Sequence, residues 1–281
     1  MTTRFISVKE IRGACGITDK FISDYDFTVL AERMEDSVEN FLNTRFTPTT
    51  VIDRLQGNDT ERILLRNKPV TKLRTVNIDG TDIDLDDVRI DKISGILWLN
   101  SGASPNNFRS KSTEQYLCRI KYDYCYFNPT TTSTDSSADV VSGSSISITV
   151  DSSTGFTVGD YVELEGIDGK IEVAKVTVIA DSTHITVDTL TMDHATDTLI
   201  TKQEVPGVVK RMMVIRTAMA GVARVVGQSF DEVTGYTLSK EGESEQVQRG
   251  EPYTQWREVN VQLQQEWKTL LSSFRPIPSV M

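Results

Sequence analysis

The sequence is short of the residues on which most enzymes depend. It contains two histidines, His184 and His194, so a histidine triad or a histidine-rich metal site has little material. The three cysteines, Cys15, Cys118 and Cys125, include no Cys-x-x-Cys pair, which indicates reduced thiols and not a disulfide framework. The glycine motifs that bind nucleotides and the Gly-x-Ser-x-Gly motif of hydrolases are missing as well. We therefore expect no enzyme and no cofactor.

Long apolar runs are also missing. No stretch approaches the roughly 18 apolar residues that a membrane span requires, and the N-terminus lacks the basic and then apolar segments of an export signal. We expect a soluble protein that does not contact a membrane. The formal net charge of −10 repels a nucleic-acid backbone over long range, which excludes a protein that coats DNA through bulk charge.

Two helices are expected near the N-terminus. Ser7 and Glu10 have the spacing of a capping box, which predicts a short helix ending within residues 13–16. After Asp26, apolar residues recur at steps of three and four, which predicts an amphipathic helix ending near Asn43.

Strands are expected next. From Glu61 to Tyr126 the apolar period changes to two, which predicts antiparallel strands separated by turns. Asp79-Gly80 and Ser94-Gly95 have the composition of tight turns. Pro69 should mark a strand start or an edge, because proline cannot donate to a β ladder.

The composition changes again after residue 127. Residues 128–145 are small and polar, which predicts a linker without order of its own. Residues 146–204 contain short β-rich runs separated by glycine and aspartate, which predicts a small barrel or sandwich. The helical period returns at Val205-Pro206-Gly207, and a polar segment, a last helix and an extended proline-containing tail follow.

The sequence therefore predicts an α+β fold in which a helical bundle packs with antiparallel sheet and hairpins, interrupted by an inserted all-β domain. Residues 1–127 and 205–281 form the two parts of the scaffold, 128–145 the linker and 146–204 the insert. Since neither scaffold part looks able to close a core alone, the two ends of the insert should lie close together in space.

Several short motifs occur in order along the scaffold. They are Val38 to Phe46, Leu64 to Val70, Val76 to Gly80, Lys121 to Tyr124, and Val205-Pro206. In this order they resemble the head-tail connector, or adaptor, family of tailed double-stranded DNA viruses. The resemblance covers residues 1–127 and 205–235, and the insert departs from a minimal adaptor.

The resemblance implies a structural virion protein of the neck, assembled in the host cytoplasm. Such a protein forms a homo-oligomeric ring, commonly of twelve subunits, between the portal and the next neck or tail-completion protein, and packaged DNA passes non-specifically through its channel. The C-terminal segment of such adaptors reaches the portal. Carried over to this chain, that segment is Phe274, Arg275, Pro276, Ile277 and Pro278.

Positive charge gathers on the predicted long helix, at Lys210, Arg211, Arg216 and Arg224. In a ring, these side chains line a channel facing DNA or pair with acidic residues of a neighbouring subunit. The alternative is an ordinary solvated helix face.

A second candidate contact is Trp256, which follows a polar segment and lies beside Tyr253. Aromatic side chains bury much area at low entropic cost, so Trp256 belongs either to the core or to a surface that docks on the portal.

Two other functions compete with the adaptor. The inserted β-domain can be a host-surface or carbohydrate-binding module, although Phe156 and Tyr161 are its only aromatic residues for sugar stacking. A metal-dependent hydrolase would need the acidic run at Asp82, Asp84, Asp86 and Asp87. That run lacks the glycine and the closing glutamate of a calcium loop, so a hairpin with a solvated polar face is favoured over a metal site.

Overall fold

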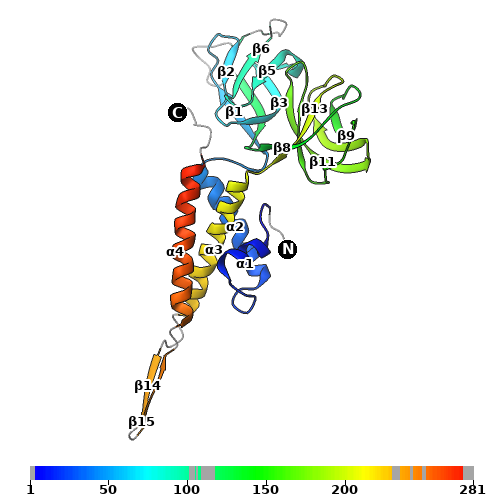
Figure 1. Ribbon diagram of the computed structural model, residues 1–281. Coiled ribbons are helices and arrows are strands. Elements are labelled where there is room, and N and C mark those ends of the chain that lie inside the picture. Colours follow the sequence, from blue (N-terminus) through cyan, green and yellow to red (C-terminus); the bar gives the residue numbers. More distant parts are fainter. Residues whose placement is uncertain are drawn as a thin grey trace. The chain divides into compact units, whose positions relative to one another are not determined.

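The structure is a computed structural model that describes residues 4–100, 105, 107, 108, 118–229, 235–240, 243–248 and 251–274. Its described residues combine helices with antiparallel sheets, so the α+β class is confirmed. The chain divides into two compact units, one made of Met1–Thr44 with Pro206–Pro278 and the other of Arg45–Val205 (Figure 1). The division thus separates helices from the larger sheets, and no boundary falls at residue 128.

The two predicted N-terminal helices are confirmed as α1 (Val8–Cys15) and α2 (Asp24–Leu42). At the start of α1, Ser7 N donates to Glu10 Oε2 at 2.7 Å and Glu10 N donates to Ser7 Oγ at 3.3 Å, which is the expected capping box. Ser23 caps α2, so this helix begins slightly before the predicted start. Asn43 ends it with a φ of 49°, a left-handed conformation that asparagine tolerates.

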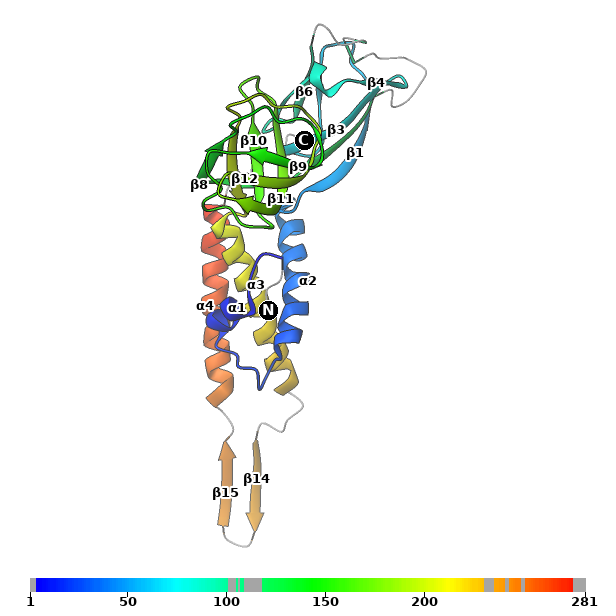
Figure 2. The ribbon, with the colours of Figure 1, turned by 90° about the vertical axis from the view of Figure 1, so that its right-hand side faces the viewer.

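The C-terminal helices are α3 (Gly207–Ser229) and α4 (Glu251–Ser273), and α3 packs against α1, α2 and α4 (Figure 2). Gly221 permits the close approach of α3 to α2, because a Cβ atom there would lie 2.8 Å from Phe27 Cε1. Between α3 and α4 the chain forms a hairpin of β14 (Gly235–Lys240) and β15 (Glu243–Gln248), which the sequence did not predict. None of the described helices is both long and apolar enough to span a membrane.

Residues 45–127, here called the β platform, form two antiparallel sheets. The first has the order β1 (Thr49–Leu55), β7 (Cys118–Tyr124), β3 (Val70–Ile78), β4 (Thr81–Ile83). The second has the order β2 (Arg62–Leu64), β6 (Ile96–Leu99), β5 (Val88–Asp91), and the 3-10 turn η1 (Leu85–Asp87) precedes β5. One core, with Leu73, Leu97 and Tyr122 fully buried, joins the two sheets.

The predicted turns of the platform are confirmed. Asp79 and Gly80 have φ values of 52° and 82° and join β3 to β4, while Gly95, at 70°, lies in the turn before β6. Pro69 immediately precedes β3, as expected for a strand start. β1 was not predicted.

Residues 128–204 form a six-stranded antiparallel sheet. Its order is β8 (Asn128–Asp135), β13 (Leu199–Glu204), β10 (Tyr161–Glu165), β11 (Ile171–Asp181), β12 (His184–Leu190), β9 (Gly143–Thr149). The sheet curls until its edge strands meet at a bridge between Ser136 and Val150 (Figure 2). Buried aliphatic residues such as Leu164 and Ile200 fill its interior.

The linker predicted over residues 128–145 is wrong, because residues 128–135 form β8. Backbone hydrogen bonds to β13 hold this strand in place. A prediction based on the burial of apolar residues does not detect such bonds. The threonines of β8 alternate between the outside and the partly buried inside, where Thr134 is buried. The following loop is fixed as well, since Ser142 N donates to Asp193 Oδ1 at 2.6 Å.

The two ends of this six-stranded segment meet. Asn128 and Glu204 are cross-strand partners in the pairing of β8 with β13. The first and last residues of the six-stranded segment are therefore neighbours at the end of the β platform.

Candidate functional site

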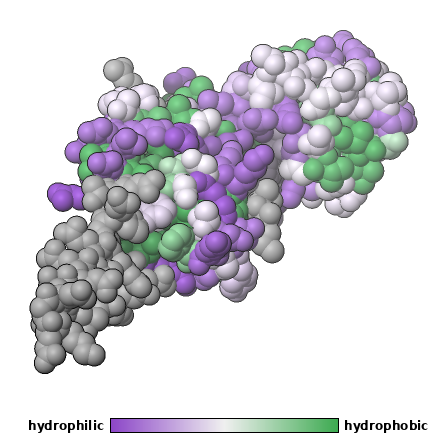
Figure 3. Space-filling model, turned by 60° about the horizontal axis from the view of Figure 1, so that its bottom comes forward, coloured by the Kyte–Doolittle hydropathy of each residue, from purple (hydrophilic) through white to green (hydrophobic). Residues whose placement is uncertain are grey.

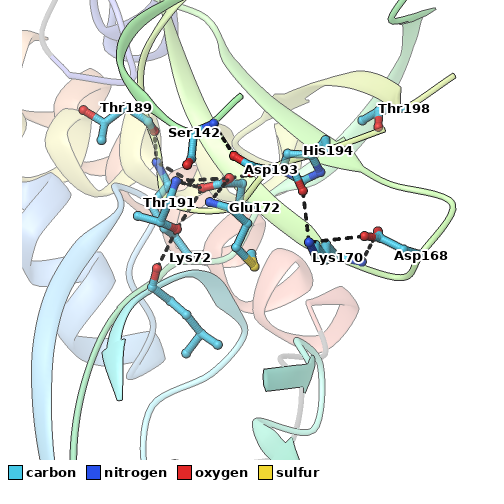
Figure 4. A network of polar contacts seen from close by, with 12 residues as sticks. Lys72, Ser142, Asp168, Lys170, Glu172, Thr189, Thr191, Asp193, His194 and Thr198 are labelled. Atoms are coloured by element: carbon cyan, nitrogen blue, oxygen red, sulfur yellow. Dashed lines mark hydrogen bonds and ion pairs between the residues drawn. The ribbon is translucent and has the colours of Figure 1, made fainter. Parts of the chain in front are cut away.

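A group of buried charges lies between β3 and the six-stranded sheet, within the second unit (Figure 4). Lys72 of β3 is 3% exposed and Glu172 of β11 is fully buried. Lys72 Nζ lies 3.7 Å from Glu172 Oε2 and also donates to the carbonyl oxygen of Thr189. We call these residues, with Thr191, Met192 and His194, the junction.

Glu172 is the centre of the junction, because several donors converge on its carboxylate. Thr191 N lies 3.0 Å from Oε2, while Met192 N and His194 Nε2 each lie 3.1 Å from Oε1. The Thr191 hydroxyl donates to the carbonyl oxygen of Leu73 at 2.7 Å, which ties the loop after β12 to β3. A buried carboxylate needs such partners, since burying an unpaired charge is very costly.

Two more ion pairs join the β platform to the six-stranded sheet and its loops. Lys92 pairs with Glu163, and Lys170 Nζ lies 2.7 Å from Asp86 Oδ1. Partial burial lowers the pKa of Lys170, but the hydrogen bond to Asp86 and the nearby carboxylates outweigh it and raise the pKa. The six-stranded sheet is therefore fixed to the platform by one buried and two partly exposed ion pairs.

The charged groups of the junction hold chain segments of the second unit together. A general acid or base must reach a proton of the substrate, whereas the side chains of His194 and Glu172 are both fully buried. His194 Nδ1 has no hydrogen-bond partner among the described residues, and the absent side chain of Gly166 leaves room beside it, since a Cβ there would lie 3.3 Å from this nitrogen.

The other histidine lies at the surface. His184 Nδ1 is 2.9 Å from Asp181 Oδ1. The backbone amide of Thr183 and then His184 lower the pKa of Asp181 to about 2. This pair orders the turn between β11 and β12.

The acidic run Asp82 to Asp87 spans the end of β4 and the 3-10 turn η1. Asp84 caps η1 by accepting from Asp86 N at 3.1 Å, and Asp82 accepts from the amide of Asn77 at 2.8 Å. Within the part of the chain that the structure describes, no group of three histidine, cysteine or acidic residues could hold a metal ion.

The positive residues of α3 have partners within their own chain. Arg211 makes two hydrogen bonds to Glu266 of α4, at 2.6 and 2.9 Å, and Arg224 Nη2 lies 3.2 Å from Asp26 Oδ1 of α2. The guanidinium of Arg216 lies 5.7 Å from the centre of the Trp267 ring. Lys210 is half-buried on the same helix. These contacts fasten α3 to its neighbours, and a role in a channel or between subunits stays a prediction.

The residues predicted to dock on the portal lie at α4. Trp256 is half-buried, and its ring meets that of Phe21 edge to face at 6.1 Å. Phe21 is 54% exposed, so this pair lies at the surface of the helical unit. Phe274 follows α4, and its N–H donates to Leu270 O at 2.9 Å. Residues 275–278 lie outside the described residues.

The six-stranded sheet offers no open aromatic platform at the two predicted positions. Phe156 is 5% exposed, and the ring of Tyr161 stacks on that of Phe127 at 5.1 Å. Figure 3 shows an apolar patch on this part of the molecule. The exposed large apolar residues of the sheet and its loops are aliphatic, namely Val141, Val158, Ile167, Val178 and Leu199.

Sequence reasoning did not find the junction. Lys72 and Glu172 lie 100 positions apart, and each belongs to a β-rich run, where a charged residue usually faces solvent. The one local signal was the position of each charge inside an apolar run. A comparison of the chain with protein-family models found no match, and neither did a comparison with curated proteins.

Proposed function

We propose that this chain is a head-to-tail adaptor of a tailed double-stranded DNA virus. It is a structural virion protein and not an enzyme. It forms a ring in the virion neck between the portal and the next neck or tail-completion protein, after assembly in the host cytoplasm. Its helices and platform are the adaptor scaffold, a helical bundle with antiparallel sheets, and the six-stranded barrel is an insert.

The observation that supports this proposal best is the pairing of Asn128 with Glu204. A segment that begins and ends at one place can be added to an existing fold without disturbing it. Removing residues 128–204 leaves the family motifs in their order, and helices from both ends of the chain form one unit.

The motifs also fall at points that determine the course of the scaffold. Val38 to Phe46 includes the end of α2, Val76 to Gly80 includes the β3–β4 turn, and Val205-Pro206 precedes α3. Caps and turns depend on specific residues, so a fold is most easily recognised in a sequence at these positions.

The charge of α3 suits a channel for sliding DNA. Arg211, Arg216 and Arg224 would otherwise attract phosphates, but each has an acidic or aromatic partner in its own chain. A partly neutralised wall holds passing DNA less tightly than a bare basic wall.

The junction supports a positioning role for the insert. Because the insert is fixed to the platform by buried and exposed ion pairs, it would stand in one orientation on every subunit of a ring. A module in a fixed orientation suits a spacer or a contact with the capsid or with a neighbouring subunit.

Co-purification with the portal protein of the same virus tests the proposal. We expect the full chain to co-elute with the portal, and a chain that ends at Phe274 to lose this binding. The matched control replaces two exposed insert residues, Val158→Ser and Ile167→Ser, and should bind the portal normally. A full chain that never co-elutes would contradict the adaptor role, and loss of binding in the control alone would favour a function of the insert.

A further inference from the structure

The hairpin of β14 and β15 lacks an extensive packing partner among the described residues. Its strands pair with each other along their whole length, from Gly235 with Gln248 to Lys240 with Glu243. They form a sheet of their own, and no other described element packs extensively against either strand. A single two-stranded hairpin is at best marginally stable in water, and a further strand or a helix usually supports it. The described part of the chain does not supply this support.

The strand register gives this hairpin one partly apolar face. Tyr236 is the cross-strand partner of Val247, and Leu238 follows two residues after Tyr236. Because successive residues of a strand belong to opposite faces, these three residues share a face. The opposite face consists of small and polar residues, namely Gly235, Thr237, Ser239, Ser244, Gln246 and Gln248. The first face is therefore the one that suits a packing contact.

The hairpin lies at one end of the helical unit, where it joins the end of α3 to the start of α4 (Figure 2). Arg224, near the end of α3, pairs with Asp26 at the start of α2. Trp256, near the start of α4, contacts Phe21. The loop between α1 and α2, residues 16–23, therefore lies at the same end of the unit as the hairpin.

This end also carries exposed aromatic residues beside a hollow. Phe21 is 54% exposed and Tyr25 is 71% exposed. The hollow has a volume of about 570 Å³ and is lined by residues of α1, the α1–α2 loop and Asp24. It is open at Gly13 and Gly16, where a Cβ atom would meet nothing within 4 Å. Aromatic residues beside a concave surface are typical of protein contacts. We call Phe21, Tyr25 and the hollow the acceptor surface.

A second copy of the chain in the proposed ring fits the acceptor surface best. Cyclic symmetry places the same end of every subunit at the same level, so the hairpin of one copy and the acceptor surface of the next share one height. A six-residue strand spans about 20 Å, roughly twice the spacing of packed helices, which is enough to reach a neighbour. DNA fits the hairpin less well, because its strands contain Lys240 but also Glu243 and Glu245, which repel phosphates.

We propose that the apolar face of the hairpin, with Tyr236, Leu238 and Val247, docks on the acceptor surface of the next copy of this chain. The inference rests on the proposed ring and names the segments that join one subunit to the next. Two different surfaces make a head-to-tail contact, which closes into a ring when the rotation allows. Because the contact is largely apolar, 1 M salt should leave it intact, since salt screens charges and does not weaken apolar burial.

Two variants of the full chain test the contact. The hairpin variant carries Tyr236→Ser and Leu238→Ser. The acceptor variant carries Tyr25→Ser and Gly13→Gln, which places a long side chain in the hollow. Sedimentation velocity and electron microscopy, with and without the portal, measure assembly. We expect either variant to raise the apparent dissociation constant at least roughly tenfold.

The matched control changes the opposite face of the hairpin, with Thr237→Ala and Gln246→Ala, and should assemble like the original chain. A chain in which a short glycine-serine linker replaces residues 235–248 checks the fold. Since the hairpin does not support the helices, this chain should keep the melting temperature of the original and still lose assembly. Assembly that the hairpin variant or the linker chain retains would overturn the contact.

Cross-linking tests the contact between copies directly. Chains with Leu238→Cys are mixed with chains with Tyr25→Cys under mild oxidation, and the natural cysteines are buried. A disulfide requires Cα atoms within about 7 Å, so a covalent dimer of the two variants forms only where the hairpin meets the acceptor surface of another copy. Mass spectrometry identifies the linked peptides. Ser239→Cys, on the opposite face, should give much less dimer with Tyr25→Cys, and equal yields would count against the contact.

The outcomes separate this contact from the proposed function. If rings form with the portal but are indifferent to both variants, the contact is wrong and the adaptor role stands. If the chain never assembles, with or without the portal, both are wrong. If the hairpin variant forms rings normally but no longer binds the portal, the hairpin contacts the portal and the proposed contact is overturned.

Discussion

Replacing Glu172 by alanine should destabilise the second unit strongly. The substitution leaves the buried ammonium of Lys72 with the carbonyl of Thr189 and removes the acceptor of the Thr191 and Met192 amides. Removing one partner of a buried pair costs about 3–5 kcal/mol. The two amides that lose their acceptor add a cost of their own, so we expect a value at or above the upper end of that range.

The matched control is Lys170→Met, which breaks the Lys170–Asp86 pair at the edge of the same junction. The carboxylate of Asp86 is 53% exposed, so its pairing should contribute below about 1 kcal/mol. Replacing both buried partners, with Lys72→Met and Glu172→Leu together, should recover the part of the loss that comes from the unpaired charge. The amides of Thr191 and Met192 still lack their acceptor, so that part of the loss remains.

Unfolding in urea, followed by circular dichroism, measures these differences. Residues 128–204 contain no tryptophan, so tryptophan fluorescence would miss the unfolding of the six-stranded sheet. Hydrogen exchange should show faster opening of β11 and β12 in Glu172→Ala. The reasoning fails if Glu172→Ala costs no more than Lys170→Met, or if the double replacement is as unstable as the single one.

Three further predictions concern local features. Ser7→Ala removes the capping hydroxyl of α1 and should cost about 1 kcal/mol in thermal unfolding, and no loss would contradict the capping box. The amide of Thr183 lowers the pKa of Asp181 from 3.8 to about 2, so this carboxylate stabilises the fold above about pH 4 and loses its effect as the pH falls towards 2. The difference in stability between Asp181→Asn and the original chain should therefore shrink over that range, and a constant difference would contradict the assignment. Gly221→Val should lower the free energy of unfolding by about 1–3 kcal/mol, because the new side chain meets Phe27. Hydrogen exchange of α3 measures this loss, and an unchanged exchange rate would contradict the prediction.

Local signals predicted the helices and turns well. The capping box at Ser7 and Glu10 and the left-handed turn at Asp79-Gly80 each depend on residues within one or two turns of chain. Such features form in the structure where the sequence places them, because their hydrogen bonds and side-chain contacts are local. The apolar stripe expected on α2 is correct only in part, because the buried face includes Glu35 and Glu39 while Phe41 is 61% exposed.

The strand β1 was missed because its apolar pattern is reversed in the middle. Ile52 points outwards, while Asp53 is 4% exposed and accepts hydrogen bonds from Tyr122 Oη and Arg66 N, each at 2.8 Å. Burial raises the pKa of Tyr122, which keeps its hydroxyl available as the donor. From the sequence alone, an aspartate at this position predicts a loop, because the hydrogen-bond partners that allow its burial belong to other segments.

The junction was missed for a related reason. Its charges are compensated by partners far away in sequence, so the physical reason for burying Lys72 with Glu172 exists only in the folded chain. The linker prediction failed in the same way, because the order of β8 comes from its pairing with β13.

Electron microscopy of the chain mixed with the portal of the same virus tests the adaptor role most directly. The account predicts a closed ring of this protein, coaxial with the portal and with the insert at one fixed position on every subunit. Portal particles that gain no added ring, while the chain stays monomeric in the same mixture, would contradict it.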